Sequence, residues 1–493
     1  MKVLYELITS SFFISTCLFA LLAFSSATSG GGEQQHLHVF QEKAKKDPSV
    51  VTLSTANKLI VHEVIFAISQ SNMEQLIQVL DDVSDPSSNN YGKHWSKSQV
   101  AEFTANKKGY NAVVAYLNSK QDVIIDRQSL YGEYIFAKAP VHVWEDVFAT
   151  TFHTYEISIS KPGEKRKQKL KVIRTEEYSL PVELDGHVLT VLNTVQFHGE
   201  NAAIKRYKND HDYISVPKPQ NDLFGERTFL SKEMAPMTDS LATYSTPTPQ
   251  PSSLYEIGSV TPRFLTKYYS ISSTIAKYQV SQAVYETDGQ GYSPSDLTMF
   301  QQTFGLQQQS PKLNQYGSFS NNCPSGYCDK GNLDVQYIMG IAQNVETTYD
   351  YELTDQYDFL TNWVVSVSNT VTPANVYSIS WGSIEFFMSS SFANVFNVEA
   401  IKLGVMGTTI LAASGDDGVL PHMARGNASY CEYSPLFPAS SPYVVAVGGT
   451  NVSHYSYLCL KRLCRQLSHS YPPYFVGPSV EPARSGMPIW SME

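Results

Sequence analysis

Two aspartates stand in settings where a carboxyl group could act as a general acid or base. Asp416 lies in the Ser-Gly-Asp-Asp-Gly sequence of residues 414–418, directly after the short apolar run of residues 410–413. An apolar run that ends in a glycine-bearing turn is typical of a buried parallel strand that reaches the carboxyl edge of its sheet. Asp334 lies in a predicted helix among apolar neighbours such as Val335, which indicates a partly buried position. Two such carboxyl groups facing one cleft would have raised pKa values and would work best at low pH.

Each aspartate also has an ordinary structural interpretation. Asp416 and Asp417 are common turn formers that bond to their own backbone. Asp334 follows Lys330 by one helical turn, so the two side chains could form a solvated salt bridge on one helix face. The residues alone leave both interpretations open.

The elements around these aspartates alternate between strand and helix, which is typical of a doubly wound, mostly parallel α/β sheet. The predicted strands cover residues 282–286, 376–380, 410–413 and 443–447. The predicted helices start at the cap Ser293, include residues 333–340, and include residues 392–403 with Gly404 as the stop. Three strands end in glycine-bearing loops, at residues 380–382, 414–418 and 448–450, and parallel strands would bring these loops to one edge.

The N-terminal part of the chain predicts a separate α+β unit. Its expected order is βααββαβ. The elements are a strand at 59–69, a helix at 73–83, a helix capped by a Ser96/Gln99 capping box, strands at 123–126 and 131–138, a helix at 140–149 and a strand at 152–159. Residues 208–260 are rich in Pro, Ser and Thr, which predicts a linker open to proteases.

Composition limits the compartment and the partners. Lys2, the apolar residues 12–24 and the small residues 25–29 predict a signal peptide over residues 1–28, and no later stretch approaches a membrane span. We therefore expect a soluble chain in a secretory or lysosomal lumen, and the sequons at Asn427 and Asn451 fit that location. A net charge of −10 without a basic block argues against nucleic acid or an acidic membrane as a partner.

The cysteine spacing favours a disulfide over a metal site. Five cysteines remain after the predicted signal peptide, an odd number that leaves one free or one whose partner is missing. Cys323 and Cys328 are close enough for a local disulfide. Cys459 and Cys464 have the same spacing, so a four-cysteine zinc site is an alternative. A lumenal location and the distance between the two pairs favour the disulfide, and we predict no metal site.

Several motifs, in matching order, resemble the sedolisin family of serine-carboxyl peptidases, which includes lysosomal and secreted fungal tripeptidyl peptidases. The motif at residues 82–94, Asp-Val-Ser-Asp-Pro-Ser-Ser-Asn-Asn-Tyr-Gly-Lys-His, is similar to the hallmark of the family's propeptide. The others resemble its catalytic domain: Ser-Pro-Ser-Asp-Leu at 293–297, Leu-Asp-Val-Gln-Tyr at 333–337, Ser-Ile-Ser-Trp-Gly at 378–382, Ser-Gly-Asp at 414–416, Phe-Pro-Ala-Ser-Ser-Pro-Tyr at 437–443 and Ala-Val-Gly-Gly-Thr at 446–450. The resemblance covers residues 60 to 453.

The resemblance implies a subtilisin-like α/β fold with a removable propeptide over residues 29–207. It implies a partial peptidase domain over 261–453 and a divergent tail over 454–493. The family uses a Ser nucleophile, a Glu base, an Asp that orients the Glu and a second Asp in the oxyanion hole. By motif, Asp334 is similar to the orienting Asp and Asp416 to the oxyanion Asp. A polypeptide substrate or the chain's own propeptide is the implied partner, no cofactor is identifiable, and the family's calcium site lies beyond the matched residues.

Two features depart from the family pattern. The base Glu lies four residues before the orienting Asp, and that position is Lys330 here, while the neighbouring Asp329 is rotated about 140° away from Asp334 at roughly 100° per residue. The nucleophile loop Gly-Thr-Ser-Ala-Ser has no match after residue 450, and Ser485 lacks the motif. We expect a chain of acid peptidase descent that lacks the C-terminal part of its catalytic domain and does not cleave peptides. The alternative is a secreted pseudopeptidase or peptide-binding protein whose residues 60–200 inhibit an active relative.

Overall fold

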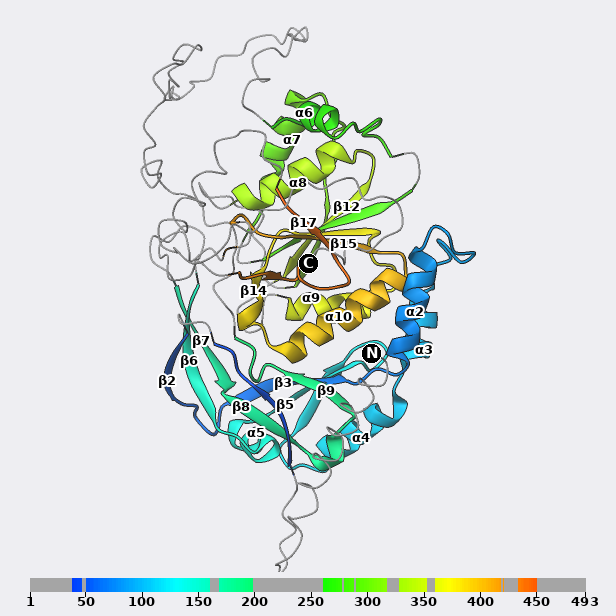
Figure 1. Cartoon of the computed structure of the whole chain (residues 1–493). Coiled ribbons are helices and arrows are strands. Elements are labelled where there is room, and N and C mark those ends of the chain that lie inside the picture. The colour runs from blue at the N-terminus through cyan, green and yellow to red at the C-terminus, as the bar shows by residue number, and fades with distance from the viewer. Residues whose placement is uncertain are drawn as a thin grey trace, which may run out of the picture. The chain divides into compact units, whose positions relative to one another are not determined.

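The computed structural model describes residues 38–46, 50–159, 168–197, 260–276, 279–287, 290–316, 328–352, 360–417, 420 and 433–449 (Figure 1). The predicted signal peptide, the tail and nearly all of the predicted linker lie outside these residues. The predicted boundaries at 28/29, 207/208 and 453/454 fall there too, together with Asn427, Asn451 and Cys323, whereas the boundary at 260/261 lies at the start of a described segment.

The described residues 260–449, called the sheet region below, fold around a parallel sheet. Its strands are β10 (Ser281–Glu286), β11 (Lys312–Tyr316), β12 (Glu346–Glu352), β13 (Val376–Ile379), β15 (Thr409–Ala413) and β17 (Val445–Val447). In the described part of the chain these make a six-stranded sheet in the order β11-β12-β10-β13-β15-β17, and every pairing is parallel. The strands that end in the glycine-bearing loops, β13, β15 and β17, are neighbours, so these loops gather on one edge as expected.

Helices cover both faces of this sheet (Figure 1). They are α6 (Pro262–Tyr268), α7 (Pro294–Thr303), α8 (Asp329–Ile341), α9 (Thr361–Asn369) and α10 (Ser390–Val405). On one face, Tyr349 and Tyr351 of β12 pack with Val335 of α8. On the other face, Tyr285 of β10 belongs to the same core as Trp363 of α9 and several residues of α10. The doubly wound, mostly parallel α/β class predicted from the sequence is confirmed.

Short elements complete the sheet region. The strands β14 (Ser383–Ile384) and β16 (Leu436–Phe437) pair antiparallel, and a 3₁₀ turn, η2, covers Glu385–Phe387.

Some elements of this region were not predicted from the sequence. They are α6, β11, β12, α9 and the short strands β14 and β16. β12 has the sequence Glu-Thr-Thr-Tyr-Asp-Tyr-Glu, and its acidic residues obscure a strand that is buried along most of its length. α9 is rich in β-branched valines, which lower helix propensity, and it forms because its apolar face is buried. α10 continues through Gly404 to Val405, so the predicted stop at Gly404 is wrong; Gly407, with φ +89°, makes the turn after the helix.

The described residues 38–197, called the N-terminal region below, form an α+β unit. Its helices are α2 (Met73–Ser84), α3 (Lys97–Thr104), α4 (Lys107–Asn118) and α5 (Val141–Phe148). Its strands are β1 (His38–Lys43), β2 (Val51–Thr55), β3 (Val61–Ile68), β4 (Ile124–Gln128), β5 (Tyr134–Pro140), β6 (Phe152–Ile159), β7 (Gln168–Thr175), β8 (Glu177–Pro181) and β9 (Val188–Leu192). Within the described residues they build sheets of the order β4-β5-β3-β9, β2-β6-β7 and β1-β8, and the turn η1 covers Val182–Leu184.

The predicted βααββαβ order is correct for the elements from β3 to β6, apart from a missing helix, and incomplete beyond them. The Ser96/Gln99 capping box is present at the start of α3. The elements absent from the prediction are β1, β2, α4, β7, β8 and β9. β1 is mostly half-buried and β2 is exposed, so neither shows the strict apolar alternation on which the prediction relied; both pair with strands about 100 or more residues later. α4 contains Gly109 near its start, which weakens its helical pattern.

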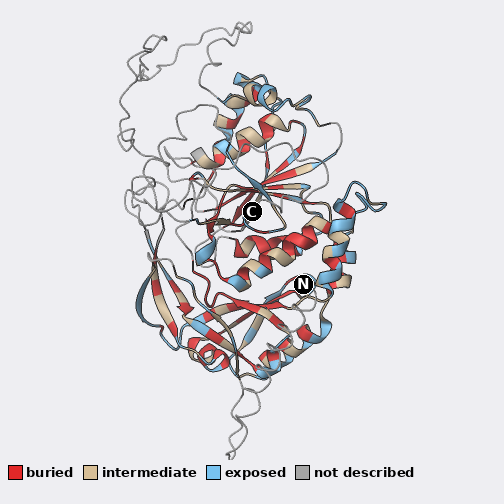
Figure 2. Cartoon of the chain, in the orientation of Figure 1, coloured by how far each residue is buried: buried red, intermediate tan, exposed pale blue. Residues whose placement is uncertain are grey.

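The N-terminal region and the sheet region share buried apolar contacts. Leu76 of α2 and Val100 of α3 form one cluster with Ile401 and Val405 of α10. β3, β5 and β9 contribute to the main core on the other side of α10. α10 is therefore buried over much of its length (Figure 2), and its buried residues include the charged Glu399 and Lys402.

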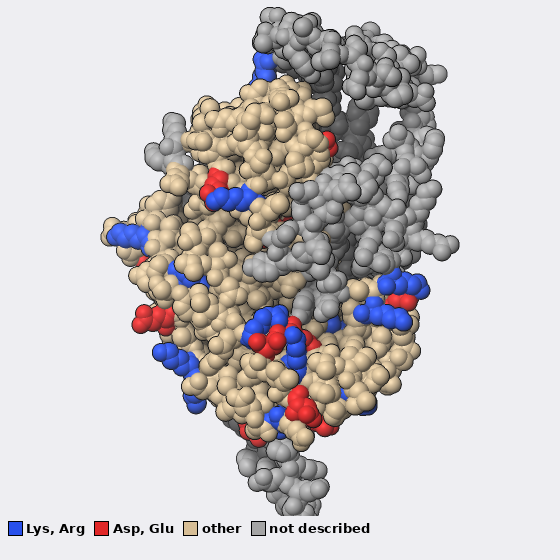
Figure 3. Space-filling view, turned by 180° about the vertical axis from the view of Figure 1, so that it is seen from behind, with Lys and Arg blue, Asp and Glu red and all other residues tan. Residues whose placement is uncertain are grey.

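Surface charges are mixed on the face of the molecule drawn in Figure 3, where Lys and Arg side chains lie among Asp and Glu side chains. Among the described side chains, Arg127 and Lys138 pair with Glu63 and Asp126. Within the described residues, no helix has the length and apolar character that a membrane crossing needs.

Candidate functional site

The helix α8 holds Lys330 and Asp334 one turn apart on the same face. The Nζ atom of Lys330 lies 2.5 Å from Oδ2 of Asp334, and the two side chains are only 10% and 11% exposed. The pairing that the sequence suggested as a structural alternative is therefore present, but it is nearly buried rather than solvated. A charge pair at this depth is stronger than the usual surface pair between neighbouring helical turns, because water screens it less.

Glu286, the last residue of β10, faces the same lysine. Its side chain is fully buried, and its Oε1 atom lies 3.9 Å from Lys330 Nζ. The indole Nε1 of Trp381 donates a hydrogen bond to Glu286 Oε2 at 2.9 Å. Burial raises the pKa of Glu286 well above its usual value; the positive charge of Lys330 opposes the rise, and the negative charge of Asp334 adds to it.

The sequence analysis did not identify Glu286, although a signal for it existed. Glu286 ends an apolar parallel strand at the sheet edge, which is the same setting that drew attention to Asp416. Its full burial and its contact with Trp381 depend on the packing of β10 against the loop after β13, which no local pattern shows.

Asp416 follows β15 in the turn that the sequence predicted. Gly415 has φ +99°, a left-handed conformation that favours glycine, and it presents Asp416 as an exposed residue while Asp417 is buried. Gly418 lies outside the described residues. The negative charges of Asp334 and Asp416 both raise the pKa of Lys330. A cleft shared by the two aspartates stays a prediction.

These charges keep Lys330 protonated. Burial alone would lower the pKa of Lys330, but the charges of Glu286, Asp334 and Asp416 outweigh burial and raise it. The ammonium also lies 5.8 Å from the ring centroid of Trp381, within cation–π range. An ammonium ion has three N–H donors and no acceptor, so this side chain cannot take a proton from an attacking group.

Close packing fixes the start of α8. A β-carbon at Gly331 would overlap with the carbonyl oxygen of Gly291 and the hydroxyl of Tyr349, so only glycine fits there. Asn332 accepts a hydrogen bond from the backbone N–H of Ser293 at 2.7 Å and donates one to Asp296 at 3.1 Å. These contacts tie the first turn of α8 to the start of α7 and thereby set the position of Lys330.

Around Lys330, the described residues offer no metal centre and no free thiol. Among them, no group of three or more His, Cys, Asp or Glu side chains is suited to a metal ion. Cys328 precedes α8 and is disulfide-bonded; its predicted partner Cys323 lies outside the described residues, so the pairing stays a prediction. The alternative zinc ligands Cys459 and Cys464 and the serine Ser485 lie outside them as well.

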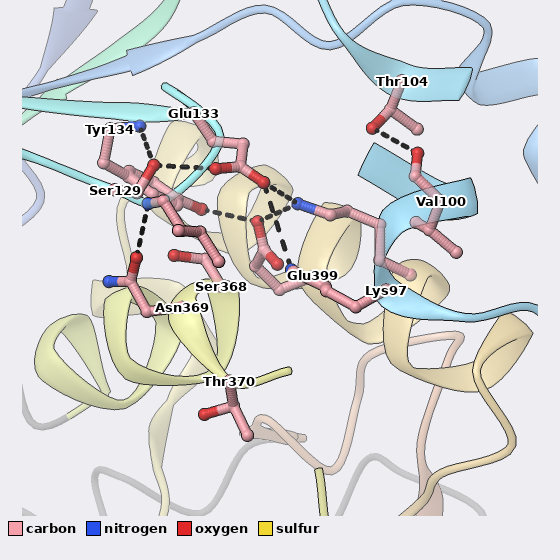
Figure 4. A network of polar contacts seen from close by, with 12 residues as sticks. Lys97, Val100, Thr104, Ser129, Glu133, Tyr134, Ser368, Asn369, Thr370 and Glu399 are labelled. Atoms are coloured by element: carbon pink, nitrogen blue, oxygen red, sulfur yellow. Dashed lines mark hydrogen bonds and ion pairs between the residues drawn. The ribbon is translucent and has the colours of Figure 1, made fainter. Parts of the chain in front are cut away.

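A second buried cluster of charges joins the N-terminal region to α10 (Figure 4). In this interface cluster, Lys402 lies 2.9 Å from Glu399 and 3.2 Å from Glu133, and the Tyr134 hydroxyl donates to Glu399 at 3.0 Å. Lys97 lies 4.0 Å from Glu133, and all four charged side chains are at most 5% exposed. Burial alone would raise the pKa of Glu133, but the charges of Lys402 and Lys97 hold it below its usual value.

The chain is similar to one family model and to several known proteins. Residues 49–197 match the family model of the pro-kumamolisin activation domain. The chain is 26% identical over 430 residues to tripeptidyl-peptidase 1 of Homo sapiens, covering 82% of this chain and 64% of that protein. It is 23% identical over 462 residues to tripeptidyl-peptidase SED2 of Arthroderma otae, covering 88% and 70% of the two chains. It is 25% identical over 507 residues to aorsin of Aspergillus oryzae, covering 89% and 71%.

A solved structure of Pseudomonas sedolisin, a serine-carboxyl proteinase complexed with pseudo-iodotyrostatin, is also similar. Its sequence identity is 27%, the match covers 40% of this chain and 55% of that chain, and the TM-score is 0.30. The chain spans 64% of the length of the tripeptidyl-peptidase 1 relatives that it matches.

Proposed function

Because the chain belongs to the sedolisin family of peptidases, we propose that it has the architecture of an acid serine-carboxyl peptidase zymogen but does not itself hydrolyse peptides. The ancestral activity would be that of a tripeptidyl peptidase or an endopeptidase. The observation that carries the proposal is the ammonium group of Lys330, which is paired with Asp334 at 2.5 Å in the position where the family has its base Glu.

The chemistry of peptide hydrolysis explains why this lysine matters. In the family, the Glu accepts the proton of the attacking serine while the Asp of the next turn orients it. A carboxylate can still accept a proton in acid, where a histidine would already be protonated. A lysine whose pKa is raised is a cation at every pH at which such an enzyme works, so the proton has no acceptor there. In addition, no match to the Gly-Thr-Ser-Ala-Ser nucleophile loop occurs in these 493 residues.

In this proposal, Asp416 keeps the place of the family's oxyanion Asp. An Asp can donate a hydrogen bond to an oxyanion only while it is protonated, which requires an acid medium. Asp416 is exposed at the turn after β15, where it can meet a bound peptide. We therefore assign polypeptides as the ligand class of this edge of the sheet, with Asp416 and Asp334 as the residues inherited from the peptidase site.

The direct test is an activity assay of the 493-residue chain on an unblocked tripeptide substrate at about pH 4, where carboxyl groups titrate. We expect no turnover above the buffer rate. Lys330→Glu alone should not restore turnover, because the attacking hydroxyl is still absent. Turnover that Asp416→Asn abolishes, together with covalent labelling of a serine, would show that a nucleophile is present and the proposal is wrong.

The second candidate is a binding or inhibitory protein of the secretory pathway. The contact between the N-terminal region and α10 favours it, because that contact combines two apolar clusters with the interface cluster and could be made with the corresponding helix of an active relative. The test is to add the purified chain to an active sedolisin-family peptidase and to measure its rate. We expect concentration-dependent inhibition, weakened in a Tyr134→Ala variant and unchanged in the exposed Tyr91→Ala control; no inhibition at any concentration would contradict this candidate.

The predicted signal peptide and the sequons lead to the same compartment. We propose that the chain enters the secretory pathway and acts in the extracellular space or in a lysosome. Fractionation of cells that express the tagged chain, with a glycosidase shift assay, distinguishes this from a cytosolic location.

A further inference from the structure

Gly404 makes a notch in the last turn of α10. Glycine is unfavourable inside a helix because it loses more backbone freedom than alanine on folding. The benefit that offsets this cost lies on α2. A β-carbon at Gly404 would lie 2.6 Å from Cδ1 of Leu80, and the three heavy atoms nearest to it, apart from the adjacent backbone of α10, all belong to that leucine. Leu80 therefore occupies the space that a larger residue at position 404 would fill.

The helix α2 lies beside one end of α10 and meets it with an apolar face (Figure 1). Leu76, Leu80 and Val83 are three or four residues apart, so they lie on the same side of α2. Leu76 is buried in one cluster with Ile401 and Val405 of α10. Leu80 packs against this cluster and reaches the notch. Contacts of this kind depend on the size of each side chain, because overpacking and truncation both weaken them.

The motif at residues 82–94, which resembles the hallmark of the family's propeptide, completes the contact at the end of the helix. Asp82 accepts a hydrogen bond from Asn90 at 2.6 Å, which closes the motif into a turn after α2. The next residue, Trp95, donates its backbone N–H to the carbonyl of Val405 at 3.0 Å. The last carbonyls of a helix have no partner within it, so this bond marks the end of α10. The N-terminal region thus contacts both the side and the end of one helix.

We propose that Leu80 and the notch at Gly404 decide which helix the N-terminal region can bind, and that its partner in trans is a sedolisin-family peptidase with glycine at the position of Gly404. This inference rests on the second candidate function, inhibition of an active relative, and names its partner. The contact within one chain competes with the contact in trans, because one leucine cannot fill two notches. Filling the notch of this chain should therefore release its N-terminal region for the peptidase, whereas truncating Leu80 should weaken both contacts.

Hydrogen exchange on the full chain tests the contact itself. Gly404→Leu fills the notch and should speed exchange in α2 by about tenfold, because overpacking weakens the contact. The milder Gly404→Ala should speed exchange while Leu80 is present, but not in a Leu80→Ala background, where the space is free. Leu59→Ala, an exposed change in the same region, should leave α2 as it is. Unchanged exchange in α2 after both substitutions of Gly404 would overturn the proposal.

Inhibition separates selection by the notch from simple loosening. The probe is an active sedolisin-family peptidase with glycine at the corresponding position, compared with the same peptidase carrying leucine there, whose own turnover shows that it is folded. For the glycine-bearing peptidase, the apparent inhibition constant should fall about threefold with Gly404→Leu, because more of the chain is competent to bind. It should rise about tenfold with Leu80→Ala. The leucine-bearing peptidase should not be inhibited.

The two variants both loosen the chain's own contact, so opposite shifts in inhibition are the result that only the notch explains. A shift in the same direction for both variants, or equal inhibition of the two peptidases, would overturn the inference. No inhibition of either peptidase would contradict the second candidate function and the partner with it. The absence of peptide hydrolysis by the chain is measured separately and does not depend on these results.

Discussion

The N-terminal region and the sheet region both bury ionisable side chains, but burial lowers the pKa of a histidine in the first and raises the pKa values of acids in the second. In the N-terminal region, His62 is buried and its pKa is lowered to about 4, chiefly by burial and also by the charge of Arg174. In the sheet region, the buried acids Glu286, Asp350 and Glu352 have raised pKa values, and burial is the largest cause in each case. As the pH falls, the folded N-terminal region therefore resists protonation of His62, whereas the folded sheet region favours protonation of its three buried acids.

The sign of each effect follows from proton binding. A histidine with a lowered pKa binds fewer protons folded than unfolded between about pH 4 and 6.5, so its contribution to stability is lost as the pH falls through that window. An aspartate whose pKa is raised from 3.8 to about 7 binds more protons folded than unfolded between those values. Its contribution is lost as the pH rises instead. The comparison indicates that acidification loosens the N-terminal region while the sheet region keeps its stability.

The interface cluster is where the two regions are joined, and breaking it should have the largest effect. Replacing Lys402 by Met leaves Glu133 and Glu399 buried with only Lys97, at 4.0 Å from Glu133, as a neighbouring cation. We expect a loss of about 3–5 kcal/mol in the free energy of unfolding, measured by chemical denaturation at pH 7, because an uncompensated buried charge is costly. Lys138→Met, in the exposed network with Glu63, should cost less than about 1 kcal/mol. Similar losses in both variants would show that the interface cluster contributes no more to the free energy of unfolding than the exposed network does.

The pH response of the N-terminal region sharpens the comparison. At about 1.4 kcal/mol for each tenfold change in proton affinity, the lowering of the His62 pKa from 6.5 to about 4 corresponds to about 3 kcal/mol of stability lost between pH 7 and pH 4. His62→Gln keeps a donor for the carbonyl of Asn193, which His62 Nε2 contacts at 2.9 Å, and it does not titrate. Denaturation curves of both proteins at the two pH values provide the measurement. Equal pH dependence in the two proteins would rule out His62 as the acid-sensitive group.

In the sheet region, the hydrogen bond from Trp381 to Glu286 should matter next. Trp381→Phe keeps most of the apolar volume but removes the indole N–H that Glu286 Oε2 accepts at 2.9 Å. Since Glu286 is fully buried, we expect a loss of about 1–3 kcal/mol in the free energy of unfolding at pH 7. The loss should be no larger at pH 4, where Glu286 is protonated in both proteins. A larger loss in acid than at pH 7 would contradict the raised pKa of Glu286.

The smallest effect is expected at a helix cap in the N-terminal region. Ser96→Ala removes the side chain that accepts from the backbone N–H of Gln99, so the capping box at the start of α3 is lost. We expect a loss of about 1 kcal/mol in the free energy of unfolding. Hydrogen exchange followed by mass spectrometry should show faster exchange in α3 and no change in β10. Equally faster exchange in α3 and β10 would show that the two regions unfold together as one unit, and it would contradict the comparison between them.

Local features of the fold were predictable because they depend on neighbours in sequence. The cap Ser293 of α7, the capping box at Ser96 and the turn at Gly415 are recognised from side chains within five residues of one another. The pair of Lys330 and Asp334 follows from the helical repeat alone. The apolar strands β10, β13 and β15 were found for the same reason, since their buried faces produce continuous apolar runs.

Features that depend on distant contacts were missed. β12 contains Asp350 and Glu352, and only its place between β10 and β11 makes it a strand. β1 pairs with β8 well over 100 residues away. The interface cluster joins Glu133 to Lys402 across 269 positions. No window of sequence contains both members of such pairs.

The sequence by itself determined that a lysine stands one turn before Asp334, that Asp416 follows a glycine at the end of a strand, and that the elements around them alternate as in a parallel sheet. Only the tertiary structure decided that Lys330 is nearly buried, that Glu286 faces it and that the charge of Asp416 reaches it. The physical reason is that spacing along a helix or strand is a local property, whereas burial sets the strength of a charge interaction. Burial depends on which distant segments pack over the site.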